Sequence, residues 1–190
     1  MSNLEKYLKS LGKQEEVKES KIIVNRNPRL DEICRNYETW LNEDKLDWDK
    51  NYNNALENHS KKEYTSKDIQ DFSIELVKYQ DRKHFENTGL FLSALINHSR
   101  RKKFVIVTEL LDKTIDFIGY ANTKDVDVKG NAGYYAGYWN EGTVSVGGNA
   151  GYCAGYWNEG KIKVNGKISS LSDYASGEIY ESGRRIKWAI

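Results

Sequence analysis

Proline, cysteine, methionine and histidine are scarce in this chain. Its 190 residues include one proline, one methionine, two cysteines and three histidines. The cysteines, Cys34 and Cys153, stand far apart in unlike sequence, which argues against a disulfide framework. His59, His84 and His98 have no ligand spacing to one another or to the cysteines, which argues against a metal site. Because a serine nucleophile elbow and a Cys–His arrangement are also absent, the sequence predicts no enzyme, no catalytic residues and no cofactor.

Long apolar runs are absent too, and neither sign of charge is in excess. Lysine and arginine number 29 against 28 aspartates and glutamates, and this balance holds on both sides of Val126. Near-neutral charge argues against nucleic acid as a partner. The N-terminal sequence lacks the apolar run of a signal peptide, and no later run is long enough to span a bilayer. We therefore expect a cytoplasmic protein without membrane contact.

Residues 1–26 read as a charged tail or a short amphipathic helix, and residues 27–103 as a helical region. Asn27 and Pro28 can begin the first helix of that region. Its apolar face would carry Leu30, Ile33, Cys34, Tyr37, Trp40 and Leu41. Cys34 lies within this stripe, so we expect a small core residue and not a reactive thiol.

Two more helices are predicted after the first. Residues 42–64 are polar and read mostly as a connection, with one weak helical turn around Trp48. Thr65 and Asp68 form a capping box that would begin the second helix. The third, through residues 85–96, is apolar nearly all round. We expect it to be buried against the other helices and one end of the remaining chain.

The region 104–190 is organised by a repeat. Residues 130–142 read GNAGYYAGYWNEG and residues 148–160 read GNAGYCAGYWNEG, an interval of 18 residues. A short period with fixed glycines is typical of stacked coils, in which each coil covers the face of the next. Degenerate copies around Gly119 and Gly166 flank the two regular ones. The sequence thus predicts a short parallel β-solenoid capped by the N-terminal helices.

Each coil has one predicted strand and several corners. Alternating β-branched pairs indicate strands with one face turned inward: Val126 and Val128, Val144 and Val146, and Ile162 and Val164. Gly137 and Gly155 fit corners that need a positive φ or a close backbone approach. Asn140 and Asn158 are interpreted as turn residues that tolerate an unusual φ.

Coils of the form GNAGxxxG followed by G-x-V/I-x-V-x-G resemble those of the GXGXG β-solenoid family. That family includes the C-terminal domain of the glutamate synthase large subunit and one of the subunits of formylmethanofuran dehydrogenase. The resemblance covers about residues 104–188 and implies a right-handed parallel β-helix that serves as a scaffold without catalytic residues of its own. The chain departs from the family at Tyr134 and Tyr152, where relatives often have an aspartate. The expected fold is therefore α+β, with N-terminal helices capping a right-handed parallel β-helix of about 18-residue coils.

Stacking would align equivalent side chains of neighbouring coils about 4.8 Å apart. The aligned pairs are Tyr134 over Tyr152, Tyr138 over Tyr156, Trp139 over Trp157 and Glu141 over Glu159. The interior of such a coil is too thin for all these rings, so some must lie outside, beneath the helices or in an exposed ladder. The two glutamates could act as an acid–base pair, but carboxylates pointing into water at a coil corner are the simpler interpretation. We take these eight residues as candidates for binding a partner.

The far end of the stack needs protection because its last strand has unpaired backbone groups. Residues 178–181 place Glu181 at a position that points inward in earlier coils, and such a charge discourages edge-to-edge stacking. Ile186, Trp188 and Ile190 alternate in the tail and would fold over the open coil as a lid. We expect a monomer with a self-capped edge; the alternative is a two-fold homodimer through the same C-terminal edge.

No convergent polar constellation accompanies the repeat. We therefore expect a non-enzymatic β-solenoid scaffold that acts through contact with another protein. Two alternatives stay open at this point. One is an accessory subunit of a redox enzyme complex, as the resemblance implies. The other is a carbohydrate- or nucleic-acid-binding surface that uses the aromatic ladder as a stacking platform.

Overall fold

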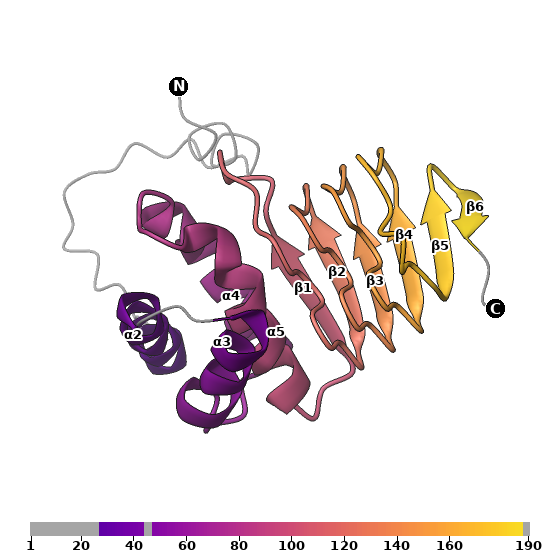
Figure 1. The fold of residues 1–190 in the computed structure, drawn as a ribbon. Coiled ribbons are helices and arrows are strands. Elements are labelled where there is room, and N and C mark those ends of the chain that lie inside the picture. The colour runs from indigo at the N-terminus through magenta and orange to yellow at the C-terminus, as the bar shows by residue number, and fades with distance from the viewer. Residues whose placement is uncertain (1–26, 44–46, 188–190) are drawn as a thin grey trace.

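The computed structural model describes residues 27–43 and 47–187. The expectations for residues 1–26, Trp188 and Ile190 lie outside this part of the chain. Helices gather at one end, and a row of strands leads away from them (Figure 1). The expected α+β arrangement, a β-solenoid with coils of about 18 residues and N-terminal helices, is confirmed.

The elements follow one another in two groups. The helical elements are α2 (Pro28–Asn42), α3 (Trp48–Asn54), the π-helical turn η1 (Ala55–His59), α4 (Ser66–Glu75), the 3-10 turns η2 (Leu76–Tyr79) and η3 (Phe85–Asn87), and α5 (Thr88–His98). The strands are β1 (Lys103–Val107), β2 (Asp125–Lys129), β3 (Thr143–Val146), β4 (Lys161–Val164), β5 (Glu178–Glu181) and β6 (Arg184–Lys187).

Three helices begin or lie where the sequence predicts them. The Asn27 side chain accepts a hydrogen bond from the Arg29 backbone N–H (3.1 Å) at the start of α2, and Pro28 occupies the first turn. The capping box of Thr65 and Asp68 begins α4. The α5 helix is buried along nearly its whole length, as its apolar sequence requires.

The helical turn predicted around Trp48 is confirmed, but the prediction that the rest of residues 42–64 is mostly a connection is wrong, because helical structure continues to His59. Asp47 caps α3 by accepting a hydrogen bond from the Lys50 backbone N–H (2.8 Å), and η1 follows directly. Tyr52 and Ala55 reach the core from this segment. Its few apolar residues are too sparse to show a helical period, so tertiary packing, not propensity, decides the structure here.

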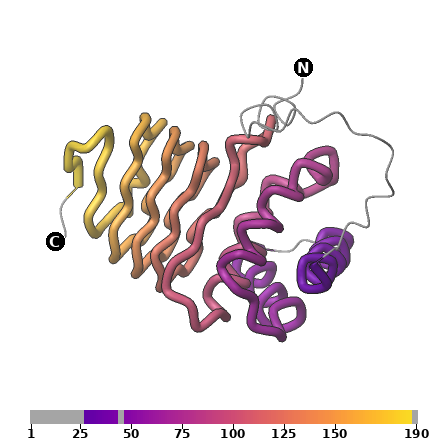
Figure 2. The backbone as a smooth tube through the Cα atoms, turned by 180° about the vertical axis from the view of Figure 1, so that it is seen from behind, coloured from indigo at the N-terminus to yellow at the C-terminus, as the bar shows by residue number. Residues whose placement is uncertain are grey.

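The strands pair in sequence order, with β1 to β5 parallel and β6 antiparallel to β5. Val126, Val144, Ile162 and Ile179 occupy one register position in successive coils, and all four are buried. Phe104 pairs with Val126, so the first coil is longer than the regular repeats. Seen from behind, the coils form successive turns of one stack (Figure 2).

The α5 helix closes the open end of the first coil. A Cβ at Gly89 would lie 2.0 Å from the carbonyl oxygen of Asp116, so only glycine permits this approach. The Ser93 hydroxyl oxygen accepts a hydrogen bond from the Tyr120 backbone N–H (3.1 Å). Buried side chains of the helices and of the coils form one continuous core. The first coil therefore depends on the helices for its packing.

The coil corners differ from expectation in one respect. Gly137 and Gly155 have the predicted positive φ, 70° and 74°. The interpretation of Asn140 and Asn158 as turn residues with unusual φ is wrong. Both are fully buried, and the positive φ belongs to the tryptophan that precedes each of them. The asparagines instead form hydrogen bonds inside the stack.

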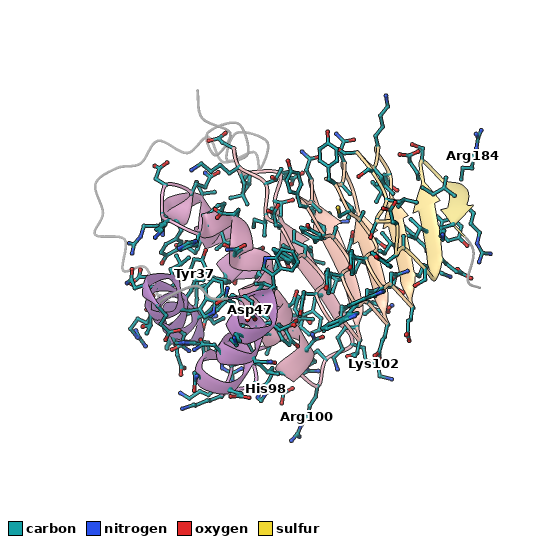
Figure 3. The ribbon with its side chains drawn as sticks, in the orientation of Figure 1. Tyr37, Asp47, His98, Arg100, Lys102 and Arg184 are labelled. Atoms are coloured by element: carbon teal, nitrogen blue, oxygen red, sulfur yellow. The ribbon has the colours of Figure 1, made fainter. Side chains whose placement is uncertain are left out.

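At the far end, β6 covers the edge of β5 within the same chain. Glu181 lies in register with Val164, as predicted, and its Oε1 accepts a hydrogen bond from the Ile168 backbone N–H (2.7 Å). The expected packing of Ile186 across the coil end is wrong, because β6 continues the sheet as an edge strand and leaves Ile186 37% exposed. Arg184 extends outward from this edge (Figure 3).

Candidate functional site

Large aromatic side chains gather along one corner of the coils. Trp139, Trp157 and Tyr174 are 39%, 44% and 59% exposed. Tyr138 is buried and Tyr156 half-buried, and each meets the tryptophan that follows it edge to face. We call these five residues the aromatic edge. Four of them are predicted partner-binding residues that the structure brings together; Tyr174 is an addition.

Rings of neighbouring coils stack along the aromatic edge. The ring centroids of Trp139 and Trp157 are 5.5 Å apart and their planes differ by 11°. For Tyr138 and Tyr156 the values are 4.8 Å and 1°. This spacing follows from the coils, whose backbones lie about 4.8 Å apart. Each stacked pair stabilises the coils by about 0.5–1.5 kcal/mol beyond its buried area.

A tryptophan of the helical region borders the aromatic edge. Trp48 of α3 packs on Tyr135 and Tyr138, with centroid distances of 4.8 and 6.1 Å. In the same helix, the Asp49 carboxylate accepts a hydrogen bond from the Tyr120 hydroxyl. Burial, then this bond to a carboxylate, raises the pKa of Tyr120. The helices thus hold in place the end of the aromatic edge that lies nearest the first coil.

Two residues of the aromatic edge have a backbone conformation that suits glycine. The φ angle is 52° at Trp139 and 48° at Trp157. A bulky side chain in this left-handed region costs about 1–2 kcal/mol. Ring stacking offsets part of that cost, but a glycine or asparagine at the same position would avoid it. The same left-handed φ recurs at other coil corners, such as Tyr135 and Cys153, so the exposure of the two large rings is what makes these tryptophans candidates for function.

A pocket of about 310 Å³ opens beside the aromatic edge. Its lining consists of Ala121, Trp139, Glu141, Trp157 and Glu159. The two glutamates come from neighbouring coils, as the repeat predicts, and both are exposed. Across residues 27–43 and 47–187, neither carboxylate has an ion-pair or hydrogen-bond partner. The lining offers indoles and carboxylates without a histidine or a nucleophile, an arrangement that favours binding over catalysis.

Tyr134 and Tyr152 form a separate cluster. Their rings meet edge to face, 5.4 Å apart, and both are exposed. They lie at another corner, where the Tyr134 backbone N–H donates to Oδ1 of Asp116 (2.7 Å). Burial raises the pKa of the Asp116 carboxyl group. The single predicted ladder is therefore two clusters with no ring contact between them in the described chain.

Sequence reasoning missed Trp48 and Tyr174. A signal for Tyr174 was present in the sequence, because the interval from Gly166 to Gly177 is one residue shorter than that from Gly148 to Gly160, and the pairing of Lys161 with Glu178 agrees with it. The equivalent of Trp157 then falls on Tyr174. Trp48 lies in a helix outside the repeat, and only tertiary packing brings it to the coils.

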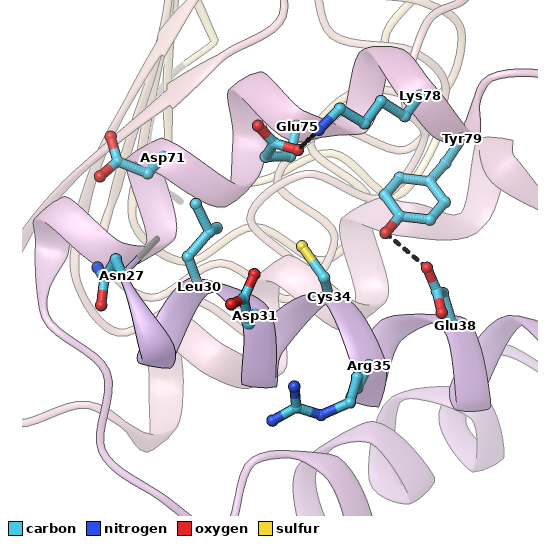
Figure 4. A pocket seen from close by; sticks show the side chains of 10 residues that line it. All are labelled: Asn27, Leu30, Asp31, Cys34, Arg35, Glu38, Asp71, Glu75, Lys78 and Tyr79. Atoms are coloured by element: carbon cyan, nitrogen blue, oxygen red, sulfur yellow. Dashed lines mark hydrogen bonds and ion pairs between the residues drawn. The ribbon is translucent and has the colours of Figure 1, made fainter. Parts of the chain in front are cut away.

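A second pocket, of about 720 Å³, lies between α2 and α4 (Figure 4). Cys34 is half-buried there, and burial raises the pKa of its thiol, which disfavours the nucleophilic thiolate. The Tyr79 hydroxyl donates to Oε1 of Glu38 (2.9 Å), and Glu75 pairs with Lys78. These side chains meet one another's hydrogen-bonding and charge requirements, so we interpret this pocket as a groove between helices that is open to solvent.

Comparison with known proteins adds no relative. No protein-family model, curated protein or solved structure matches this chain. In the part of the chain that the structure describes, no three histidine, cysteine, aspartate or glutamate side chains gather as metal ligands. None of the described helices is long and apolar enough to cross a membrane. The candidate site therefore rests on its geometry alone.

Proposed function

We propose that this protein is a non-enzymatic β-solenoid scaffold that binds another protein through the aromatic edge. The observation that carries this proposal is the pair Trp139 and Trp157, exposed and held in a strained backbone on rigid coils. Tryptophan and tyrosine dominate the binding energy of protein–protein interfaces. Exposed aromatic patches of this kind mark interaction sites. A surface that is already ordered loses little entropy when a partner binds.

Ring geometry favours a protein over a sugar or a base as the ligand. A sugar or base stacks on an open ring face. Within the aromatic edge, Trp139 and Trp157 each cover one face of the other, and Tyr138 and Tyr156 do the same. Most of the strip therefore presents ring edges, which pack well against protein side chains. The net charge of +1 further disfavours nucleic acid.

The resemblance of the coils to GXGXG solenoids suggests one class of partner. In that family the solenoid belongs to large redox enzymes. A more specific form of the same proposal is therefore that the partner is a large enzyme with an apolar docking site. The helical cap would then distinguish this chain from the solenoids that are built into such enzymes.

The proposal is tested with two matched double variants of the full chain. Trp139→Asn with Trp157→Asn removes both indoles while keeping a residue that tolerates positive φ. Tyr134→Asn with Tyr152→Asn removes two exposed rings from the same coils but from the other corner. Circular dichroism and thermal unfolding first establish that both variants keep the fold.

Each protein is then immobilised and exposed to an extract of the cells that produce it, and captured proteins are quantified by mass spectrometry. We expect a partner that the wild type and the tyrosine variant retain equally and that the tryptophan variant loses at least about tenfold, or ~1.4 kcal/mol. A partner that binds all three proteins alike, or that depends on the tyrosines, would contradict binding through the aromatic edge.

A further inference from the structure

The aromatic edge ends where the repeat changes one residue. Ala121 occupies, in the first coil, the position of Trp139 and Trp157 in the next two, with the same left-handed φ of 47°. The Ala121 backbone N–H donates to the Tyr138 carbonyl (2.8 Å), just as the Trp139 N–H donates to the Tyr156 carbonyl (2.9 Å). The first coil is thus built like the others and lacks only the indole ring.

The missing ring leaves Trp139 with a stacked partner on one face only. Trp157 lies parallel to it on one side. Tyr138 and Tyr120 meet it at 73° and 59° and do not stack on it. Ala121 and Trp139 line the pocket of about 310 Å³ together. The pocket therefore lies beside a face of the Trp139 indole on which no described ring of the first coil stacks.

Two carboxylates give the same pocket its charge. Glu141 and Glu159 belong to its lining and have no cationic partner in the described part of the chain. The cation of the next strand, Lys161, is already paired with Glu178 (2.9 Å). The pocket therefore combines negative charge with an electron-rich ring face, and both features attract a cation.

We propose that this pocket binds an arginine side chain of the partner protein. The inference rests on the proposed function, since it specifies what the partner presents to the aromatic edge. A planar guanidinium can stack on the Trp139 indole while its N–H groups reach carboxylates in both coils. Lysine would act there only as a point charge. The pocket volume, about 310 Å³, is at the low end for ligand sites and suits a single side chain.

The probes are two blocked tripeptides, acetyl-Gly-Arg-Gly-amide and the same peptide with citrulline, the neutral isostere of arginine. They are titrated into the full chain while the indole N–H signals are followed by NMR. The arginine peptide should shift the signals of Trp139 and Trp157 in a saturable way. The citrulline peptide should bind at least about fivefold more weakly. Trp40 is the internal reference, because its buried indole N–H donates to the Asn51 carbonyl (3.2 Å).

Two variants locate the site. Glu141→Gln with Glu159→Gln keeps the shape of two exposed side chains and removes their charge, so arginine should lose its advantage over citrulline. Ala121→Trp supplies the missing ring on a backbone with the same left-handed φ as at Trp139 and Trp157, and it should abolish the shift by closing the indole face. The glutamine variant alone decides the question if the tryptophan variant does not fold.

Equal binding of the arginine and citrulline peptides, no saturable shift with either, or unchanged binding by the glutamine variant would each overturn the inference. Such a failure is distinguishable from failure of the proposed function. If capture of the partner still depends on Trp139 and Trp157, the aromatic edge binds by apolar contact alone. If that dependence is also absent, both proposals fall.

Discussion

The side-chain amide of Asn140 donates a hydrogen bond to Oδ1 of Asn158 at 2.7 Å, inside the solenoid and shielded from water. Asn122 donates to Oδ1 of Asn140 in the same way, at 2.8 Å. Asn158 ends the ladder by donating to the Ser176 carbonyl (2.7 Å). One buried amide per coil therefore links each turn to the next. The ladder fixes the register of the corner that precedes each strand.

Replacing Asn140 by alanine should lower the free energy of unfolding by about 2–4 kcal/mol, because buried partners such as Oδ1 of Asn158 lose their hydrogen bond. The matched control is Asn149→Ala. Oδ1 of Asn149 accepts from the Lys167 backbone N–H (2.8 Å) at an exposed site, so its loss should cost less than about 1 kcal/mol. Urea unfolding followed by circular dichroism measures both. Equal losses would show that the ladder does not stabilise the coils.

The asparagine ladder shows how far the sequence can be read. The 18-residue interval and the alternating valines sufficed to predict coils, strands and their order. They could not reveal that Asn140 points inward, because an asparagine two residues before a glycine is equally typical of an exposed turn. Nor could they place Trp48 beside the coils, since that contact joins two regions without a shared period. Within the candidate site, the repeat aligned the pairs correctly, but only the backbone path could separate Tyr134 from Trp139.

A second prediction separates steric contact from backbone strain at two glycines. At Gly142 a Cβ would lie 2.3 Å from the Lys124 carbonyl oxygen, a backbone atom that cannot move without parting two coils. Gly142→Ala should therefore cost about 3 kcal/mol or more. Gly183 has φ of 77° and nothing within 4 Å, so Gly183→Ala should cost only the conformational strain, about 1 kcal/mol. Thermal unfolding ranks the two variants, and the reverse order would contradict this account of coil packing.

A third prediction concerns the pH dependence of stability through Asp68. Burial alone would raise the pKa of its carboxyl group, but hydrogen bonds from the Thr65 backbone, Asn27 and the Thr65 hydroxyl, with Arg29 nearby, hold the pKa below its usual range. A lowered pKa means that the folded state favours the carboxylate. Its contribution is therefore present above the unfolded pKa of about 3.9 and is lost as pH falls through the folded value.

Asp68→Asn should accordingly reduce stability by about 1–2 kcal/mol at neutral pH. The difference from the wild type should stay constant from about pH 5 to 8 and shrink below about pH 4. Urea unfolding across this pH range measures it. A difference that does not change with pH would mean that the charge of Asp68 contributes nothing and that only its hydrogen-bonding shape matters.

The last prediction concerns the edge of the sheet. The β5 strand pairs with β4 on one side and with β6 on the other. Arg185 holds β6 in place through an ion pair with Glu178 (3.2 Å) and a position over the Tyr180 ring, 5.8 Å from its centroid. Arg184 is exposed on β6 and Lys187 is half-buried, and positive charge on an edge strand opposes pairing with another chain.

Ending the chain after Ser182 should therefore expose the backbone groups of β5 and produce a larger, concentration-dependent species in sedimentation velocity. Ending it after Lys187 keeps β6 and is the matched control, which should sediment like the full chain.

Association of the control as well would place the protection in residues 188–190, as a lid would require. If the full chain is a dimer that the shorter truncation dissociates, the edge joins two copies. If the chain that ends at Ser182 stays monomeric at every concentration, β6 is not what keeps the edge from pairing, and the inward charge of Glu181 becomes the explanation to test.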